Sequence, residues 1–258
     1  MVGLLAGIIG SYLIVVSHAA ACPFGSTYAD GCGGSAASGT AQYPGMLNSY
    51  TARPQWNVAG VDYKVGIPDG TTLTPWRSAS VPNISINLSS GRVSCTTAGA
   101  HVTLNAIDFS TAAGVSPWIY DNSNDCTWTV ANSKFTCSGN YTNIVAGNIT
   151  LKNNEFDQAG CTNQPSSFAT VGGSVTVQYN WFRNGWQHVI ETGGPGSIDY
   201  RFNLIDDMVT HTSQLAGSHE NFQQLYGTAP ISADVVTFNT VYQHTAGTGN
   251  GGRLPILL

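Results

Sequence analysis

The sequence predicts an all-β fold, a parallel β-helix in which the chain winds into about six or more stacked coils. Strand-like segments recur at intervals of 26, 21, 26, 23 and 36 residues when they are aligned on the bulky residue that closes each one. Each segment alternates apolar and polar residues, as a half-buried strand does, and no helical period accompanies them. A repeat in the twenties with this pattern indicates a solenoid of β-coils.

Each repeated segment consists of a strand, a sharp corner and a second short strand. In chain order they are VTLNAIDF, WTVANSKF, ITLKNNEF, VTVQYNWF, IDYRFNLI and VVTFNTV, closing on Phe109, Phe135, Phe156, Phe182, Ile205 and Val241. Stacking places equivalent residues of neighbouring coils about 4.8 Å apart, the spacing of hydrogen-bonded strands. Residues one coil apart in the sequence are therefore expected to form columns.

Three kinds of column are predicted. Corner asparagines form the first, because Asn tolerates left-handed backbone and stacked amides hydrogen-bond along a ladder: Asn154, Asn180, Asn203 and Asn239. Period-2 alternation predicts inward core columns of Leu151, Val177, Tyr200 and Val236, and of Phe156, Phe182, Ile205 and Val241. The third kind is a surface ion-pair ladder of Asp157, Arg183 and Asp206.

The chain divides into three parts. Residues 1–21 are apolar and uncharged and end in Ala19-Ala20-Ala21, which is typical of a secretory signal peptide, with an uncleaved anchor or a buried strand as alternatives. Residues 22–80 lack the repeat and are expected to cap the open end of the solenoid. The β-helix domain is expected over residues 81–258. Its last residues resemble the start of another coil, so either the chain is truncated there or that end packs against a second subunit in a homo-oligomer.

The composition argues against several function classes. Charged residues make up 9% of the chain, against about 25% in an average protein, and no basic run occurs, so no nucleic-acid partner is expected. A P-loop, a dinucleotide fingerprint and a G-x-S-x-G elbow are absent, so no nucleotide partner is expected either. Six cysteines favour disulfides in a secreted or cell-surface protein, and Cys126 with Cys137 is the local expectation.

The segments AHVTLNAIDFS, GNITLKNNEFDQ, GSVTVQYNWFRN, GSIDYRFNLIDD and ADVVTFNTVYQ resemble the repeats of right-handed parallel β-helix proteins of the pectate-lyase-like superfamily. The resemblance covers roughly residues 80–245 and implies a right-handed solenoid. It leaves the activity open, because that scaffold serves polysaccharide lyases, glycoside hydrolases, phage tailspikes and adhesins. No cofactor is expected apart from calcium. The resemblance allows calcium, although the sequence contains no loop of clustered acidic residues that would bind it.

Potentially reactive residues gather in the last third of the chain. The interval before Val241 exceeds its neighbours by about ten residues, and the surplus, VTHTSQLAGSHENF, is expected to emerge as a loop, where sites tend to lie on rigid scaffolds. A lyase needs a base and a cation that holds an acidic sugar, whereas a hydrolase needs paired carboxylates. The candidate catalytic residues are Arg201, Asp207, His211, His219 and Glu220. The candidate substrate-binding residues are Trp181, Trp186 and His188, and no metal ligands are expected.

Each candidate also has a structural interpretation. Arg201 can be a solvated residue paired with Asp199 or Glu220, and Trp181 can be packing material beside the corner. The Gly-His-Gly and Arg-x-Lys pattern of galacturonases is absent, which argues against that type of hydrolase. The sequence therefore predicts a secreted protein that binds a polysaccharide or cell-surface glycan, with cleavage by a lyase-like or hydrolase-like reaction left open. The alternative is a non-enzymatic structural or adhesive solenoid, such as a surface fibre or a tailspike-like module.

Overall fold

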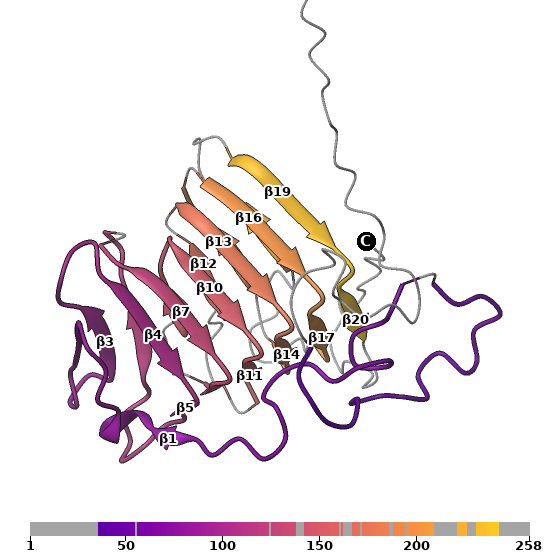
Figure 1. Cartoon of the computed structure of the whole chain (residues 1–258), viewed down its shortest axis with the longest axis horizontal. Helices are drawn as coiled ribbons and strands as arrows, with labels where there is room; N and C mark the ends of the chain where they lie inside the picture. Colours follow the sequence, from indigo (N-terminus) through magenta and orange to yellow (C-terminus); the bar gives the residue numbers. More distant parts are fainter. Residues whose placement is uncertain are drawn as a thin grey trace, which may run out of the picture.

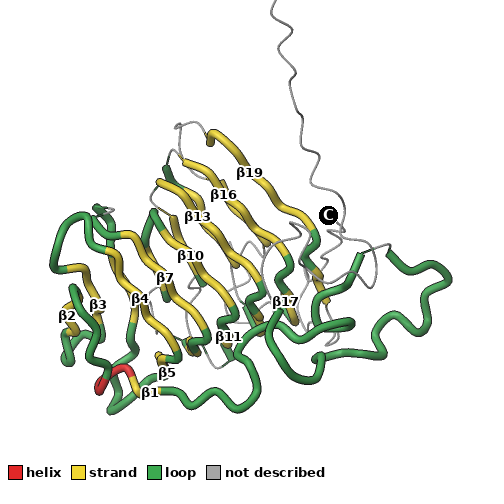
Figure 2. The backbone as a smooth tube through the Cα atoms, viewed as in Figure 1, coloured by secondary structure: helices red, strands yellow, loops and turns green. Residues whose placement is uncertain are grey.

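The computed structural model is all-β, and its one helix in the described part is a short 3-10 turn, η2 (Trp76–Ser78) (Figures 1 and 2). The structure describes residues 36–54, 56–123, 125–137, 142–159, 161, 167–170, 172–185, 188–194, 196–208, 221–225 and 231–242. Their strands form three sheets, in which every pair of named strands is parallel except the antiparallel pair of β2 and β3.

The first sheet contains β4 (His101–Asn105), β7 (Thr127–Ala131), β10 (Ile149–Lys152), β13 (Gly173–Gln178), β16 (Gly196–Arg201) and β19 (Ile231–Thr237). The second sheet contains β1 (Thr74–Pro75), β5 (Ile107–Phe109), β8 (Lys134–Thr136), β11 (Glu155–Asp157), β14 (Trp181–Arg183), β17 (Leu204–Asp206) and β20 (Thr240–Tyr242). The third sheet contains β2 (Ile84–Ile86), β3 (Arg92–Cys95), β6 (Trp118–Tyr120), β9 (Ile144–Val145), β12 (Phe168–Thr170), β15 (His188–Thr192) and β18 (Asn221–Leu225).

The chain passes through the three sheets in turn, and one such passage is called a coil here. From β4 onward, consecutive strands along the chain belong to the first, second and third sheets in turn. Every third strand is therefore added to the same sheet. Within the described residues, coils begin at β4, β7, β10, β13, β16 and β19, and Figure 1 shows these strands side by side. The residues that close the repeated segments are direct neighbours in the second sheet, which confirms the predicted stacking: Phe109, Phe135, Phe156, Phe182, Ile205 and Val241.

The core lies between the three sheets and consists of inward columns. Leu151, Val177 and Tyr200 are in register with one another and completely buried, and Val236 continues their column. In the second sheet, the inward rings stack with centroids 4.6, 4.7 and 4.7 Å apart and nearly parallel planes: Phe109, Phe135, Phe156 and Phe182. These ring distances equal the strand spacing, so the backbone ladder sets the packing of the aromatic core.

The asparagine column and its predicted amide ladder are confirmed, but the left-handed backbone expected at these asparagines lies elsewhere. Its side chains form a ladder in which Asn154 Nδ2 donates to Asn180 Oδ1 (3.0 Å), Asn180 Nδ2 to Asn203 Oδ1 (3.1 Å) and Asn203 Nδ2 to Asn239 Oδ1 (3.0 Å). The left-handed backbone lies one residue earlier, at Ala106, Asn132, Asn153, Tyr179, Phe202 and Phe238. Each accepting Oδ1 also accepts a second hydrogen bond, from the backbone N–H of the asparagine one coil earlier, at 2.8–2.9 Å. The amides therefore serve to pair buried backbone groups at a corner where strand pairing is interrupted.

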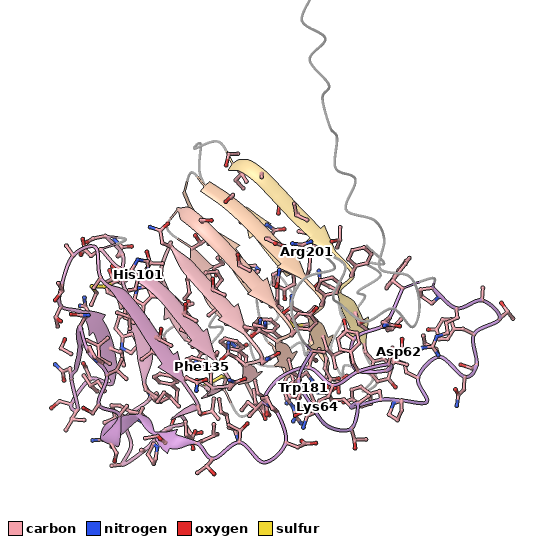
Figure 3. All side chains as sticks on the ribbon, in the orientation of Figure 1. Asp62, Lys64, His101, Phe135, Trp181 and Arg201 are labelled. Atoms are coloured by element: carbon pink, nitrogen blue, oxygen red, sulfur yellow. A yellow bond between two sulfur atoms is a disulfide. The ribbon has the colours of Figure 1, made fainter. Side chains whose placement is uncertain are left out.

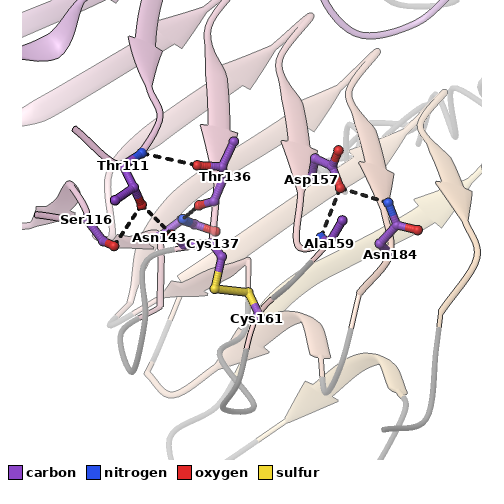
Figure 4. The surroundings of a disulfide bond; sticks show 9 residues. All are labelled: Thr111, Ser116, Thr136, Cys137, Asn143, Asp157, Ala159, Cys161 and Asn184. Atoms are coloured by element: carbon purple, nitrogen blue, oxygen red, sulfur yellow. Dashed lines mark hydrogen bonds between the residues drawn. A yellow bond between two sulfur atoms is a disulfide. The ribbon is translucent and has the colours of Figure 1, made fainter. Parts of the chain in front are cut away.

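Within the described residues there are two disulfides. Cys95, at the end of β3, joins Cys126, which precedes β7, and Cys137, after β8, joins Cys161, after β11; Figure 4 shows the second. The predicted pair Cys126–Cys137 is wrong. Cys126 precedes β7 and Cys137 follows β8, so these two cysteines stand at opposite ends of two consecutive strands. Closeness along the chain is a poor guide in a coil, because the spatial neighbours are one coil away.

The disulfides are typical of an oxidising compartment outside the cytosol. Within the described residues, no helix is long and apolar enough to span a bilayer. The predicted signal peptide lies outside the described residues.

Residues 36–54 and 56–72, called the strap here, lie along the flank of the later coils (Figure 1). The N–H of Gly66 donates to the carbonyl of Tyr179 at 2.8 Å, and the ring of Trp56 lies 6.0 Å from that of Phe238. Only the short elements β1, η2 and β2, which follow the strap, lie at the first coil, where β1 pairs with β5 and β2 with β3. The described part of the segment expected to be a cap thus contacts the side of the later coils as well as the first strands.

The strap covers a second apolar cluster outside the coils. Its centre is a column of left-handed aromatic residues: Tyr179 stacks on Phe202 at 5.2 Å, and Phe202 stacks on Phe238 at 5.3 Å. Bulky residues rarely adopt left-handed backbone. At the earlier corners the same position holds Ala106, Asn132 and Asn153. The aromatic residues therefore occur at the coils that the strap covers, where contacts with the strap offset the backbone cost.

Candidate functional site

The predicted site residues are spread over the three sheets. Arg201 ends β16 in the first sheet, Asp207 follows β17 in the second, and His188 begins β15 in the third. Trp181 lies in β14, beside the strap (Figure 3). Four other candidates lie outside the described residues: Trp186, His211, His219 and Glu220.

Arg201 forms the surface pair that its structural interpretation predicts. Its Nε donates to Asp199 Oδ1 at 2.5 Å, and its Nη2 donates to Asp199 Oδ2. The hydrogen bond to Asp199 is the main cause that raises the pKa of the guanidinium. Gln178 Nε2 also donates to Asp199 Oδ2, at 3.2 Å. The positive charge of Arg201 is therefore already offset within the first sheet.

Asp207 and His188 are buried at the corner between the second and third sheets. Asp207 is 5% exposed and His188 1% exposed, and Asp207 has a left-handed backbone with φ of 47°. Its N–H donates to the carbonyl of Tyr242 at 2.9 Å, while His188 Nε2 lies 4.0 Å from Glu191 Oε1. The structure thus brings neither residue together with Arg201.

Asp206 is buried beneath the strap, which corrects the predicted surface ladder. The register of Asp157, Arg183 and Asp206 is confirmed, and Arg183 Nε lies 3.8 Å from Asp157 Oδ2. Asp206, however, is only 2% exposed and accepts hydrogen bonds from the Tyr43 hydroxyl (2.6 Å) and from Trp181 Nε1 (3.3 Å). Burial, and then the hydrogen bond to Asp206, raise the pKa of Tyr43. The carboxylate therefore helps to fasten the strap.

Alkaline pH is expected to loosen the strap. The docked Tyr43 has a raised pKa, whereas a tyrosine on a released strap titrates near its ordinary value of about 10. Below about pH 10 the hydroxyl is protonated in both states and its contribution is complete; at higher pH the released form loses its proton first, so docking weakens as pH rises. Limited proteolysis of residues 36–72 across this range should show a step that Tyr43→Phe removes. An unchanged step in Tyr43→Phe would assign it to another group.

A group of side chains that the sequence analysis missed lies on the outward face of the third sheet. Ile119 is buried inward, so Trp118 and Tyr120 point outward, and their ring centroids are 5.0 Å apart at 62°. The Arg92 guanidinium lies 4.3 Å from the Tyr120 ring centroid, within the range of a cation–π contact, and Arg92 Nε donates to Ser94 Oγ at 2.8 Å. Arg92, Trp118 and Tyr120 are called the platform.

The platform begins an outward column that follows the axis of the stacked coils. Tyr120 is in register with Val145, Val145 with Ala169, and Ala169 with Glu191, and all four are partly exposed. Three strand spacings separate the ends, so Tyr120 and Glu191 lie about 14 Å apart. The column therefore has an aromatic end, a middle of small apolar side chains and an acidic end.

Buried contacts hold the platform rigidly. Asp121 directly follows Tyr120 and accepts hydrogen bonds from Asp125 N (2.9 Å), Cys126 N (3.0 Å) and Trp128 Nε1 (2.8 Å). The Cys95–Cys126 disulfide ties the end of β3, the strand of Arg92, to the same turn. Both strands of the platform are thus fixed to the next coil, and such support preorganises a binding surface.

The alternation in PWIYD, with one inward apolar residue between two rings, is the signal that could have revealed the platform. The predicted columns contain only residues of the first two sheets, so they do not include Trp118 or Tyr120. In the described part of the chain, no group of three or more His, Cys, Asp or Glu residues is placed to hold a metal ion.

These features define an all-β protein of three long parallel sheets with an aromatic and cationic platform on one lateral face. No protein-family model, no curated protein and no solved structure matches the chain.

Proposed function

We propose that the chain is a right-handed parallel β-helix protein, secreted or on the cell surface, that binds a polysaccharide along the outward face of its third sheet. Parallel strands joined by crossovers are right-handed in about 98% of cases, which supports the handedness. The two inter-coil disulfides support a location outside the cytosol.

The single observation that carries the proposal is the platform with its column. A sugar ring has an apolar face and a polar edge, and the platform offers aromatic surface next to a guanidinium. Val145 and Ala169 have short side chains, so the surface in the middle of the column lies lower than at its ends. This shape suits an extended chain of sugars that runs along the coils. About three sugar rings would fit between Tyr120 and Glu191, given the strand spacing.

Cleavage stays a prediction. The insertion lies between β17 and β18, and the backbone of Asn221, the first residue of β18, pairs with His188. Glu220 directly precedes Asn221, so the predicted loop returns to the same sheet that carries the platform. This connection favours the loop over Arg201 as the source of catalytic groups.

A second candidate function is a purely structural or adhesive solenoid. The asparagine ladder and the phenylalanine stack run unbroken through successive coils, and two disulfides tie neighbouring coils together. Such features stiffen a rod whether or not it binds sugar.

Trp118→Ala and Tyr120→Ala should each weaken polysaccharide binding about tenfold or more, because each removes stacking and apolar contact of at least about 1.4 kcal/mol. Calorimetric titration against acidic and neutral polysaccharides measures the change, and melting temperatures confirm that the variants fold. Thr103→Ala, an exposed change on the first sheet, is the matched control. Affinities that are equal in all three variants would exclude the platform as the binding surface.

The same polysaccharide panel separates binding from cleavage. A lyase generates absorbance from unsaturated products, and a hydrolase generates new reducing ends. Binding without either signal would support a non-enzymatic role on those substrates.

A further inference from the structure

A groove of about 320 Å³ opens beside η2 and the edge strand β2. Arg77 and Ser80 line it together with five aliphatic side chains: Ala79, Val81, Ile84, Ile86 and Leu88. Its volume is at the lower end of the range for small-molecule sites, which combine apolar walls with a few polar groups. None of these residues belongs to the platform or to the strap.

The aliphatic wall of the groove is only partly used by the fold. Val81, Ile84 and Ile86 pack against the main core but remain partly exposed. Leu88 is 50% exposed, one of the few large hydrophobic side chains so open in the described part of the chain. A ligand with an apolar body would remove this surface from water, which is favourable in proportion to the area covered.

Arg77 supplies a held cation at the same groove. Its guanidinium lies 4.6 Å from the Trp76 ring centroid, and its Nη2 donates to the carbonyl of Ala112 at 3.1 Å. Its Nε is buried without an acceptor, and within the described residues no carboxylate pairs with this side chain. The two N–H groups of Nη1 and the second N–H group of Nη2 are therefore left to bind an external anion.

We propose that this groove binds an unbranched aliphatic monocarboxylate, with the carboxylate on Arg77 and the chain along Val81, Ile84 and Leu88. Charge complementarity selects an anion, because no carboxylate pairs with Arg77 in the described structure. Donors left on both terminal nitrogens suit the two oxygens of a single carboxylate. The walls contain no aromatic ring, which favours a flexible alkyl chain over a sugar or an aryl group.

Calorimetric titration of the whole protein with hexanoate, octanoate and decanoate, and with 1-octanol, tests the proposal. Affinity should rise about two- to fourfold per added methylene, the gain expected for burial of apolar surface in an open groove. Octanoate should bind about tenfold or more tightly than 1-octanol, because only the carboxylate forms a charge-assisted hydrogen bond with the guanidinium. Methyl signals of Ile84 and Ile86 in NMR spectra should shift with ligand and so locate the site.

Variants separate the two halves of the site. Arg77→Gln should abolish the preference for octanoate over 1-octanol, and Arg77→Lys should retain most of it. Leu88→Ser should flatten the dependence on chain length, and its exposed position makes unfolding a poor explanation. Arg53→Gln, which removes an arginine of the strap outside the groove, is the matched control and should leave binding unchanged.

Three results would overturn the proposal: no saturable binding of any of the acids, equal affinities for octanoate and 1-octanol in the unaltered protein, or an equal loss in Arg53→Gln and Arg77→Gln. Arg77→Lys keeps the test decisive if Arg77→Gln fails to fold.

Discussion

Asn180→Ala should lower the free energy of unfolding by about 3–5 kcal/mol, because it leaves several buried polar groups without partners. The Oδ1 of Asn180 accepts from the backbone N (2.9 Å) and the Nδ2 (3.0 Å) of Asn154. Its Nδ2 donates to the carbonyls of Leu151 and Gln178, both at 3.0 Å, and to Asn203 Oδ1 at 3.1 Å. Alanine cannot replace any of these bonds, and the site is closed to water. Chemical denaturation followed by circular dichroism measures the loss.

The matched control for Asn180 is Asn105→Ala. Asn105 is exposed and accepts one hydrogen bond, from Asn132 Nδ2 at 2.8 Å, so its loss should cost less than about 1 kcal/mol. Similar costs at the two positions would mean that the amide ladder does not hold the coils together.

Phe202→Ala is expected to release the strap while the coils stay folded. Phe202 is 1% exposed and stacks between Tyr179 and Phe238 at the centre of the cluster beneath the strap. Truncating a buried phenylalanine costs about 3–5 kcal/mol, and here the loss falls on the strap contacts. Hydrogen exchange at the N–H of Gly66, which bonds to the Tyr179 carbonyl, should accelerate strongly, and a protease should cut within residues 36–72.

Tyr50→Ala is the control for strap release. Tyr50 lies on the strap but is 67% exposed, so its truncation should leave both exchange and cleavage unchanged. If Phe202→Ala instead unfolds the whole protein in one step, the strap is an integral part of the fold and not a separate cover.

Local rules account for the parts of the fold that the sequence predicted. Alternation of apolar and polar residues places Leu151 and Val177 inward, and the repeat interval places one over the other. The asparagine column follows from the same interval. The predicted amide ladder is present, whereas the left-handed backbone lies one residue earlier than local preference for Asn suggests, because the buried amides are needed for pairing.

Contacts between distant segments account for the parts that were missed. Left-handed Phe202 and Phe238 are unfavourable by local rules and become tolerable only under the strap, more than a hundred residues earlier in the chain. The strap likewise turns Asp206 from a surface charge into a buried acceptor for Tyr43. The platform escaped prediction because the third-sheet strands carry no shared motif, and only their register brings Arg92 beside Trp118.

Cysteine pairs on the open face of the first sheet test the stacking of the coils most directly. Thr150 and Thr176 are register partners on neighbouring strands, about 4.8 Å apart, whereas Thr129 and Thr176 are two strands, about 9.6 Å, apart. A disulfide requires Cα atoms within about 7 Å. Oxidation followed by peptide mass spectrometry should therefore detect a crosslink in Thr150→Cys with Thr176→Cys and none in Thr129→Cys with Thr176→Cys. A crosslink in the second pair but not the first would contradict the stacking of successive coils.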